Sequence, residues 1–429
     1  MPTLVIVGAQ WGDEAKGKIV DVLADGADVV VRYSGGNNAG HTVITGGQTF
    51  KFHLIPAGIL HPQVTAVLGS GMVVCPKSLL DEWDTARAMR SELGALKISS
   101  GAHVVFPYHK SLDVLEEAAR GHNKIGTTSR GIGPAFQDKV GRFGIRMGEF
   151  VDPEVFPVRL EEVLEYKNRL LSMLGGEAIE FKPLLDEYSI YASAPRGFVG
   201  DSESFVADPL DAGKRIMFEG AQGTFLDLDS GTYPYVTSSH PVAGGACLGT
   251  GIGPRAIDQV LGVCKAYTTR VGAGPFPTEL DNEIGDKIRE RGQEFGTTTG
   301  RGRRCGWLDL NLLRRSASLN SLSGWVVTRL DVLSGFERLH VCTGYRWNGR
   351  TLNTVPQDTF LLSQVEPDYK TVPGWDADIT GARSLADLPT AARDYLNLIE
   401  EETRTPICIV SVGPDRQQTI LHREDLIWP

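Results

Sequence analysis

Closely spaced cysteines are missing from this sequence. Its six cysteines stand at positions 75, 247, 264, 305, 342 and 408, and none forms a C-x-x-C pair. Small secreted domains and structural zinc sites depend on such spacings. We therefore expect reduced, mostly buried thiols in a cytoplasmic protein, with no cysteine in metal binding or catalysis.

Long apolar runs and an excess of positive charge are also missing. No apolar run approaches the roughly 18 residues of a membrane span, and the opening MPTLVIVGAQ lacks the basic stretch of a signal peptide. The formal net charge is -10, with 43 Lys and Arg against 53 Asp and Glu. Because nucleic acids and anionic membranes attract basic surfaces, we expect neither as a partner.

Glycine, in contrast, is abundant. The chain has 50 glycines in 429 residues, about 12% where roughly 7% is usual. No repeat or low-complexity tract accounts for them, so they indicate tight turns and close backbone approaches, as in enzymes that enclose small molecules. The length fits two or three average domains or one large α/β domain with insertions.

Apolar runs that alternate with glycine-rich or polar stretches predict an α/β fold. Buried strands are expected at 4–7, 29–33, 64–68, 72–75, 215–218, 325–328 and 407–410. A hairpin is expected around 46–47, and a helix from about 152 to 175. The stretch at about 100–210 is more helical, and we expect it to be an insertion. Because several strands end in glycine-rich segments, ligands are expected at the carboxyl edge of the sheet.

The first of these segments, GAQWGDEAKGK at 8–18, has the G-x-x-x-x-G-K spacing of a phosphate-binding loop. Its place between a strand and a helix favours phosphate binding by backbone N–H groups, helped by the charges of Lys16 and Lys18. The Ser or Thr that usually follows is replaced by Ile19. A chance turn is the alternative. Asp13 is either simply solvated or a residue that binds magnesium and accepts a proton.

Three further segments carry polar groups between glycines. In SGGNNAGHT at 34–42, His41 is either structural or a hydrogen-bond donor to a transferring phosphoryl group. GTTSRGIGP at 126–134, with Arg142 shortly after it, fits a ribose-phosphate monoester or a surface turn. In FEGAQGTFLD at 218–227, the amide of Gln222 can read the edge of a base, although a turn would also explain it.

The last segments suggest an anion site and a guanine site. GTTTGRGRRCGW at 296–307 concentrates Arg301, Arg303 and Arg304 in an acidic chain, which suits a mobile loop that closes on a carboxylate or phosphate. A solvated basic face is the alternative. In TRLD at 328–331, Asp331 can accept two hydrogen bonds from guanine, and SVGPD at 411–415 offers backbone N–H groups to its carbonyl.

Taken in order, these segments resemble adenylosuccinate synthetases over almost the entire chain. The resemblance rests on WGDEAKGK, NNAGHT, GTTSRGIGP, FEGAQGT, DSGTYPYVTSS, TRVGAGPFPTEL, TTTGRGRRCGWLDL, TRLDVL and VGPDR. It implies a single domain over 1–429, with one large, mainly parallel, helix-flanked sheet of the P-loop NTPase-like kind and smaller subdomain insertions. It also implies a cytoplasmic homodimer.

The implied activity is a ligase of AMP synthesis. IMP, L-aspartate and GTP would give adenylosuccinate, GDP and phosphate through a 6-phosphoryl-IMP intermediate, the first committed step from IMP to AMP. By this resemblance Asp13 is the base that removes the purine ring proton, and His41 assists phosphoryl transfer. Lys16 would stabilise the transferring group, and Gln222 would orient the purine. One magnesium ion per subunit would be held by Asp13 and the carbonyl of Gly40.

The resemblance also implies three sets of binding residues. For GTP they are Gly12, Asp13, Glu14, Ala15, Lys16, Gly17, Lys18, Gly40, His41, Thr42, Arg303, Arg329, Leu330, Asp331, Ser411, Val412 and Gly413. For IMP they are Asp13, Lys16, Asn38, Ala39, Gly40, His41, Thr128, Arg142 from the second subunit, Gln222, Thr237 and Arg301. For aspartate they are Thr297, Thr298, Thr299, Gly300, Arg301, Gly302 and Arg303.

Four positions depart from the family pattern. Ala15 and Ser129 replace usual glycines, Gly302 replaces Pro or Arg, and Arg329 replaces Lys. Because alanine is strained at positive φ, we expect a helical or extended conformation at Ala15.

Two other functions remain as alternatives. A viral relative acts on dGMP and often lacks the aspartate matched by Asp13, so its presence here favours IMP without excluding dGMP. A guanine-nucleotide switch would need a hydroxyl in place of Ile19 and an Asp-x-x-Gly after a strand. The stretches 138–141 and 378–381 have that spacing, but neither follows an apolar strand.

Overall fold

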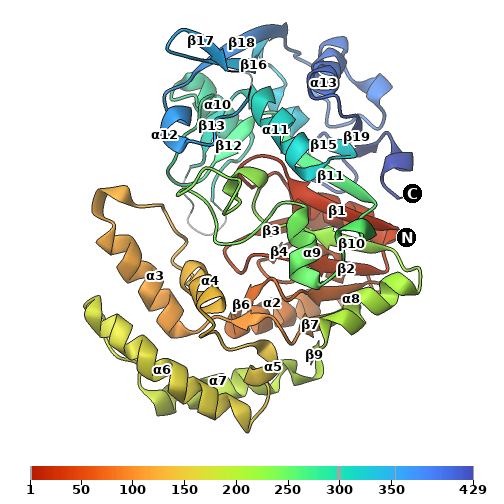
Figure 1. Ribbon diagram of the computed structural model, residues 1–429. Coiled ribbons are helices and arrows are strands. Elements are labelled where there is room, and N and C mark those ends of the chain that lie inside the picture. Colours follow the sequence, from red (N-terminus) through yellow and green to blue (C-terminus); the bar gives the residue numbers. More distant parts are fainter. Residues whose placement is uncertain (1, 297–299, 301, 353, 429) are drawn as a thin grey trace.

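The computed structural model describes residues 2–296, 300, 302–352 and 354–428 (Figure 1). Within these residues a ten-stranded sheet runs through the centre of the molecule. Its strands, in spatial order, are β20 (Thr419–Leu421), β19 (Ile407–Ser411), β15 (Gly324–Thr328), β11 (Gln259–Lys265), β1 (Thr3–Gly8), β10 (Ile216–Glu219), β2 (Val29–Arg32), β5 (Thr65–Leu68), β7 (Ala95–Ser99) and β9 (Val199–Gly200). All neighbouring pairs are parallel except β19 and β20. The predicted large, mainly parallel sheet is confirmed.

Strand β1 lies near the middle of this sheet and shows why its sequence is continuously apolar. It pairs with β10 on one side and β11 on the other, so that Val5 stands opposite both Phe218 and Val260. Leu4 and Ile6 join the core cluster on one face, while Val5 and Val7 join the cluster on the opposite face. A strand that is covered on both faces needs apolar residues at every position.

Helices cover both faces of the sheet. Helix α1 (Lys16–Leu23) packs with Leu4 and Ile6, and α8 (Ser202–Asp211) and α9 (Gly244–Thr250) pack with Val5 and Val7. The other helices are α2 (Pro76–Met89), α3 (Pro107–Ala119), α4 (Ile132–Gly141), α5 (Met147–Phe150), α6 (Val155–Met173), α7 (Phe181–Ser193), α10 (Glu283–Arg291), α11 (Leu310–Asn320), α12 (Thr359–Leu362) and α13 (Thr390–Thr403). Of the described helices, none is long and apolar enough to cross a lipid bilayer.

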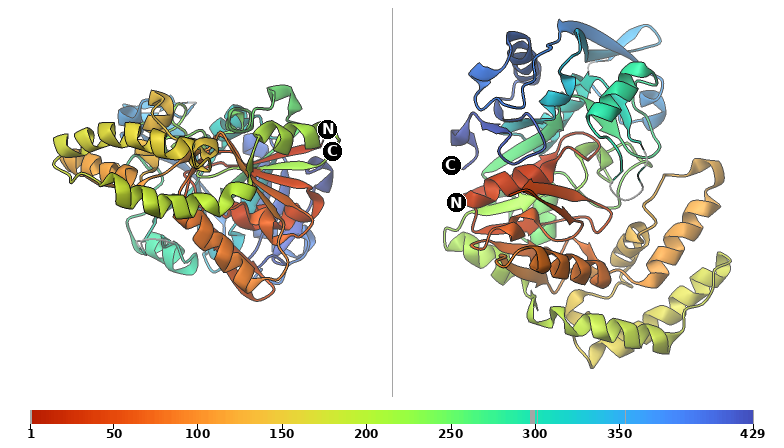
Figure 2. Two further views of the ribbon diagram at one scale, coloured as in Figure 1. Left: turned by 90° about the horizontal axis from the view of Figure 1, so that it is seen from below. Right: turned by 180° about the vertical axis from the view of Figure 1, so that it is seen from behind.

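Within the described residues, four smaller sheets are separate from the central one. One contains β14 (Leu308–Asp309), β16 (Arg338–Trp347), β17 (Arg350–Leu352) and β18 (Glu366–Pro373). Three pairs complete the set: β3 (His41–Thr45) with β4 (Gln48–Phe52), which is the predicted hairpin, β6 (Val73–Val74) with β8 (His103–Val104), and β12 (Thr268–Arg270) with β13 (Arg304–Gly306). Figure 2, like Figure 1, places α3 to α7 and β16 to β18 at opposite ends of the central sheet.

The stretch at about 100–210 is mainly helical, as its sequence indicates. It contains α3 to α7 and most of α8, and the predicted helix that starts near 152 is α6. Strand β9 returns from this stretch to the edge of the central sheet and pairs with β7. Its description as a separate insertion within a single domain stays a prediction.

Parallel strands bring their carboxyl ends to one edge, and this edge positions the site. The loops 9–15, 33–40, 220–223, 329–331 and 412–415 follow β1, β2, β10, β15 and β19. These are the glycine-rich or polar segments singled out in the sequence. In an open α/β sheet, ligands bind at this edge.

Candidate active site

A cavity of about 350 Å³ lies where three of these loops meet. The loops after β1, β2 and β10 form much of its wall, with residues of α3 and α4 and the segment 235–238 opposite. Of the residues predicted from the sequence, the cavity is lined by Gly12, Asp13, Glu14, Ala15, Lys16, Gly17, Asn38, Ala39, Gly40, His41, Thr42, Thr128, Gln222 and Thr237. Loops far apart in the chain thus present their polar groups to one space.

The contacts of Glu14 explain how a carboxylate is tolerated inside an anion-binding loop. Its side chain is completely buried, and Oε1 accepts hydrogen bonds from the backbone N–H groups of Gln10 and Gly12 at 3.0 and 2.9 Å. Its Oε2 pairs with Nζ of Lys16 at 2.6 Å. The carboxylate therefore closes the loop on itself and fixes the lysine, while Nζ also donates to the carbonyl of Gln222. A buried charge that is paired and hydrogen-bonded in this way is tolerated.

Two residues of the same loop have left-handed backbones. Asp13 has φ 60° and Ala15 has φ 65° and ψ 32°. The expectation of a helical or extended Ala15 is therefore wrong. Local preference favours negative φ for alanine, but the turn closed by Glu14 and the start of α1 at Lys16 impose the opposite sign.

His41 is held by a buried acid that the sequence analysis did not single out. Its Nδ1 contacts Oε1 of Glu219, the last residue of β10, and both side chains are buried. Burial lowers the pKa of His41, and the positive charges of Arg32 and Lys16 add to this, against the opposing effect of Glu219. Burial raises the pKa of Glu219, but His41 and Arg32 outweigh it, so the pKa of this acid is lowered. Because Glu219 stays ionised, Nδ1 of His41 is the donor in this contact.

Gln222 is oriented by both its backbone and its neighbour. Its φ is 56°, and its amide Nε2 donates to Oδ1 of Asn38 at 3.1 Å. Its amide Oε1 is buried and has no hydrogen-bond partner within the described part of the chain. A buried polar atom without a partner costs free energy, which a ligand that donates to it would recover.

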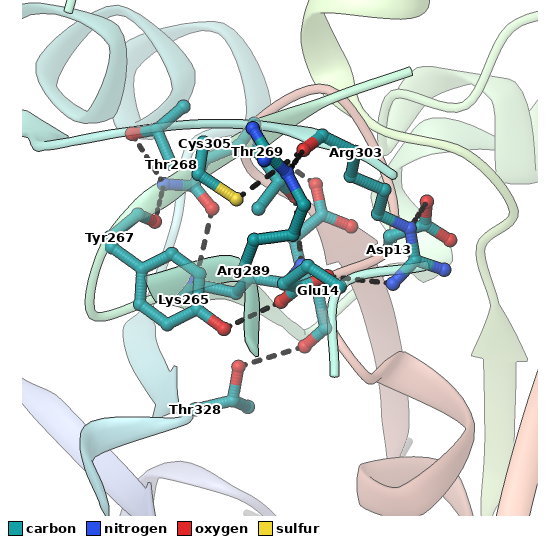
Figure 3. A network of polar contacts seen from close by, with 12 residues as sticks. Asp13, Glu14, Lys265, Tyr267, Thr268, Thr269, Arg289, Arg303, Cys305 and Thr328 are labelled. Atoms are coloured by element: carbon teal, nitrogen blue, oxygen red, sulfur yellow. Dashed lines mark hydrogen bonds and ion pairs between the residues drawn. The ribbon is translucent and has the colours of Figure 1, made fainter. Parts of the chain in front are cut away.

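A network of buried charges joins Asp13 to the arginine-rich segment (Figure 3). The Nε of Arg303 lies 2.9 Å from Oδ2 of Asp13, and its Nη1 lies 2.6 Å from Oε2 of Glu294. The other oxygen of Glu294 receives Nζ of Lys265 at 2.7 Å and the hydroxyl of Tyr267 at 2.5 Å. Burial raises the pKa of Glu294, but Lys265 and Arg303 outweigh it and lower this pKa to about 2. Glu294 is therefore a carboxylate at any ordinary pH.

The sequence comparisons fit this geometry. The sequence model of the family described as "Adenylosuccinate synthetase" matches residues 5–420. The chain belongs to the adenylosuccinate synthetase family. A relative named adenylosuccinate synthetase, from Carboxydothermus hydrogenoformans, is 55% identical over 422 residues, which cover 98% of this chain and 99% of the relative.

Solved structures agree with this membership. The fully ligated adenylosuccinate synthetase of Plasmodium falciparum aligns with a TM-score of 0.92 at 38% identity, over 98% of this chain and 99% of that one. The succinoaminodeoxyadenylate synthetase of cyanophage S-2L, bound to dGMP and dATP, aligns with a TM-score of 0.63 at 21% identity, over 99% of this chain and 98% of that one. This second likeness is one of fold.

In this member of the family the predicted guanine-binding residues lie outside the 350 Å³ cavity. Lys18 points to them: its Nζ donates to the hydroxyl of Ser411 and the carbonyl of Gly413, both at 2.7 Å, and to the carbonyl of Gln418 at 3.0 Å. Burial lowers the pKa of Lys18 to about 8, although Asp331 and Asp415 oppose it. Lys18 thus ties α1 to the segment after β19, and its expected contribution of charge at the phosphate cavity is not observed.

Asp331 has a carboxylate oxygen that is free to accept a hydrogen bond from a ligand. Its Oδ1 is buried and lacks a hydrogen-bond partner among the described residues, and burial raises the pKa of this side chain.

Arg329, one of the departures from the family pattern, has φ 62°, and Ser129, another, has φ 54°. The positions at which this member of the adenylosuccinate synthetase family replaces glycine with Ala15 or Ser129 are therefore left-handed.

Some predicted residues do not line the cavity. Arg142 is exposed at the end of α4, with φ 65°. Gly300 and Gly302 are described but lie outside the cavity. Thr297, Thr298, Thr299 and Arg301 lie outside the described residues. Arg130 donates to the carbonyl of Asn37 and lines a second cavity of about 370 Å³.

The acids of the two switch-like motifs lie away from the phosphate loop. Asp138 is buried, 2.9 Å from Nε2 of His109, and also pairs with Lys167. Asp378 is exposed and caps the N–H of Thr380 at 2.9 Å. Both acids have local structural partners, which removes the support for a nucleotide switch.

The oxygen atoms near the phosphate loop suit magnesium. Asp13 and Gly40 both line the cavity, one with a carboxylate and the other with a backbone carbonyl. Among the described residues there is no group of three His, Cys, Asp or Glu side chains able to hold a metal. Magnesium is commonly held by one or two carboxylates together with substrate phosphates, so the donor set fits.

Proposed function

We propose that this protein joins IMP to L-aspartate and converts GTP to GDP and phosphate. One observation carries the proposal. A carboxylate, an ammonium, an imidazole and an amide, from Asp13, Lys16, His41 and Gln222, line one cavity beside a phosphate-binding loop. Membership of the family over residues 5–420 supports it.

The reaction begins with proton removal by Asp13. Its carboxylate takes the proton from the ring nitrogen next to the purine 6-oxygen, and that oxygen attacks the γ-phosphorus of GTP as GDP leaves. The amine of aspartate then attacks carbon 6 of the 6-phosphoryl intermediate, and phosphate leaves. The Oδ2 of Asp13 lies 2.9 Å from Nε of Arg303, which leaves Oδ1 to take the proton.

The other three side chains act on the groups that flank Asp13. His41, held at Nδ1 by Glu219, donates from Nε2 to the phosphoryl group in its protonated form, which the carboxylate of Glu219 favours. Lys16, fixed by Glu14, neutralises charge that develops on that group. The amide nitrogen of Gln222, already donating to Asn38, has a second N–H that can donate to an acceptor atom on the purine edge and so orient the base.

Magnesium would be held by Asp13 and the carbonyl of Gly40, one ion per subunit. When bound, it draws negative charge from the GTP phosphates and so makes the γ-phosphorus easier to attack. The guanine would lie between Asp331, Arg329 and the segment 411–413. Aspartate would bind along 297–303, next to Arg303, and the IMP phosphate at Thr128 and Thr237.

We also propose a cytoplasmic homodimer in which Arg142 reaches the active site of the partner subunit. The exposure of Arg142 at the end of α4 supports this role, because an exposed guanidinium is available to a second subunit. Arg301 would contribute to the same IMP site.

The test is GTP consumption with and without IMP and aspartate. Turnover should require both, should yield adenylosuccinate, and should disappear in Asp13→Ala while the protein stays folded. Consumption of GTP that ignores IMP and aspartate would refute the ligase, and substantial turnover by Asp13→Ala would refute the role of the base. Competition between IMP and dGMP distinguishes the alternative substrate, and ATP in place of GTP measures nucleotide selection.

A further inference from the structure

The buried charge network contains one acid that the reaction does not use. Glu294 is completely buried, yet no substrate is assigned to it. It stands just before the segment 296–303, and its carbonyl accepts the backbone N–H of Arg303 at 2.8 Å, at the other end of the same segment. Its side chain and its backbone therefore both hold Arg303.

The contacts of Arg303 show what this hold achieves. Within the described residues its guanidinium uses Nε for Asp13 and Nη1 for Glu294, and no protein hydrogen bond engages Nη2. Its carbonyl receives Nε of Arg289 at 2.8 Å. With two edges of the guanidinium fixed, the direction of the remaining N–H groups is set before any ligand arrives. An arginine with its fork fixed in advance loses less freedom when it binds a carboxylate.

The charges behind Glu294 make this orientation rigid. Lys265 ends β11 and is almost fully buried, and its Nζ donates both to Glu294 and, at 2.8 Å, to the hydroxyl of Thr269. The backbone N–H of Lys265 donates to the side chain of Gln10 in the phosphate loop at 3.0 Å. Glu294 thus links Arg303 to the central sheet at the point where the phosphate loop begins.

We propose that Glu294 is a positioning residue for the substrate carboxylate, acting through Arg303. The proposal rests on the proposed function, in which Arg303 binds aspartate. Glu294 holds the guanidinium of Arg303 beside Asp13, so that the amino acid binds next to the base. Its effect therefore falls on aspartate more than on IMP or GTP.

A pair of glutamate variants separates positioning from general stability. Glu294→Gln removes the charge and keeps the shape. Glu279→Gln is the matched control, because Glu279 accepts a hydrogen bond from Nε of the neighbouring Arg304 at 2.7 Å and, among the described residues, contacts neither Asp13 nor Arg303. For Glu294→Gln the KM for aspartate should rise on the order of 10-fold or more, the size of effect seen when a residue that orients a binding side chain is replaced. The KM values for IMP and GTP should stay within about 2-fold, and the control should resemble the natural protein.

Loss of the acid alone would leave Lys265 buried without its partner. The double variant Glu294→Gln/Lys265→Met restores charge balance, so its melting temperature should recover while the KM for aspartate stays high. A KM that recovers together with the melting temperature would overturn the proposal, because the role would then be structural.

A cycle with Arg303→Met completes the test. If Glu294 acts through Arg303, then Glu294→Gln should add little to the KM for aspartate once Arg303 is replaced. Independent, multiplying effects would overturn the proposal, as would equal changes in all three KM values. Failure of the natural protein to form adenylosuccinate would instead refute the proposed function and is seen before any variant is made.

Discussion

The two ends of the proposed GTP site are built differently. At the phosphate end, Lys16 is paired with the buried Glu14 inside one short loop and borders a cavity. At the guanine end, Lys18 reaches away from that cavity and joins α1 to Ser411, Gly413 and Gln418. Two lysines only two positions apart would therefore serve opposite ends of the proposed nucleotide site. The phosphate end is organised locally, whereas the guanine end depends on contacts between distant parts of the chain.

The largest effect is expected from breaking the phosphate end. Glu14→Gln removes the partner of a buried lysine, so the free energy of unfolding should fall by about 3–5 kcal/mol. The kcat should fall on the order of 100-fold or more because Lys16 loses its fixed position. Chemical denaturation and steady-state kinetics measure the two effects.

Asp81→Asn is the control for this change. Asp81 pairs with Lys77 on the surface at 3.0 Å, with both side chains more than half exposed. Asp81→Asn should change neither the free energy of unfolding nor kcat appreciably. Equal behaviour of the two variants would show that burial of the Glu14 pair is unimportant.

At the guanine end, Lys18→Met should change affinity and leave chemistry intact. The KM for GTP should rise on the order of 10-fold, because the segment 411–418 loses three charge-assisted hydrogen bonds, and kcat should stay within about 2-fold. The ratio of GTP to ATP use should fall. A fall in kcat at unchanged KM would place Lys18 at the phosphates and erase the contrast between the two lysines.

The pH dependence of GTP binding sharpens the same contrast. Burial lowers the pKa of Lys18 to about 8, so its ammonium form prevails below pH 8 and the neutral amine above it. The ammonium has three N–H groups for its three acceptors, and the amine has two. The KM for GTP should therefore rise as pH increases through 8, and this inflection should be missing from Lys18→Met. A KM that is flat up to pH 9.5 would contradict the assignment.

The smallest effect concerns the left-handed backbone of the phosphate loop. Ala15→Gly should raise the free energy of unfolding by up to about 1 kcal/mol. Glycine removes the strain of about 1–2 kcal/mol that alanine has at positive φ, but the more flexible unfolded chain offsets part of this gain. Ala24→Gly, at φ -66° just after the end of α1, should instead lower it. Thermal unfolding of both variants gives the sign, and two changes of equal sign would contradict the strain at Ala15.

The contrast between the two ends also explains what could be predicted from sequence. The phosphate loop follows from a short pattern between a strand and a helix, and the parallel sheet gathers the loops that carry His41 and Gln222. Glu219 and Glu294 were not singled out, because their partners are distant in sequence and a lone acid in FEGA or RGQEFG has no pattern of its own.

Two errors have a physical cause in the fold. The predicted conformation of Ala15 is wrong because a turn fixed by the side chain of Glu14 overrides the preference of alanine for negative φ. The direction of Lys18 differed because lysines two positions apart on a helix face different sides. Which side faces the cavity depends on the packing of α1 against the sheet.

The position of β1 also has a consequence for synthesis of the protein. This strand ends at Gly8, whereas its neighbours β10 and β11 begin at residues 216 and 259 and are therefore synthesised later. At ordinary elongation rates of about 5–20 residues per second, the delay is on the order of tens of seconds. Throughout that delay a stretch of chain that is apolar on both sides has neither of its permanent neighbours. A chaperone that shields β1 during this delay would therefore reduce aggregation of the newborn chain.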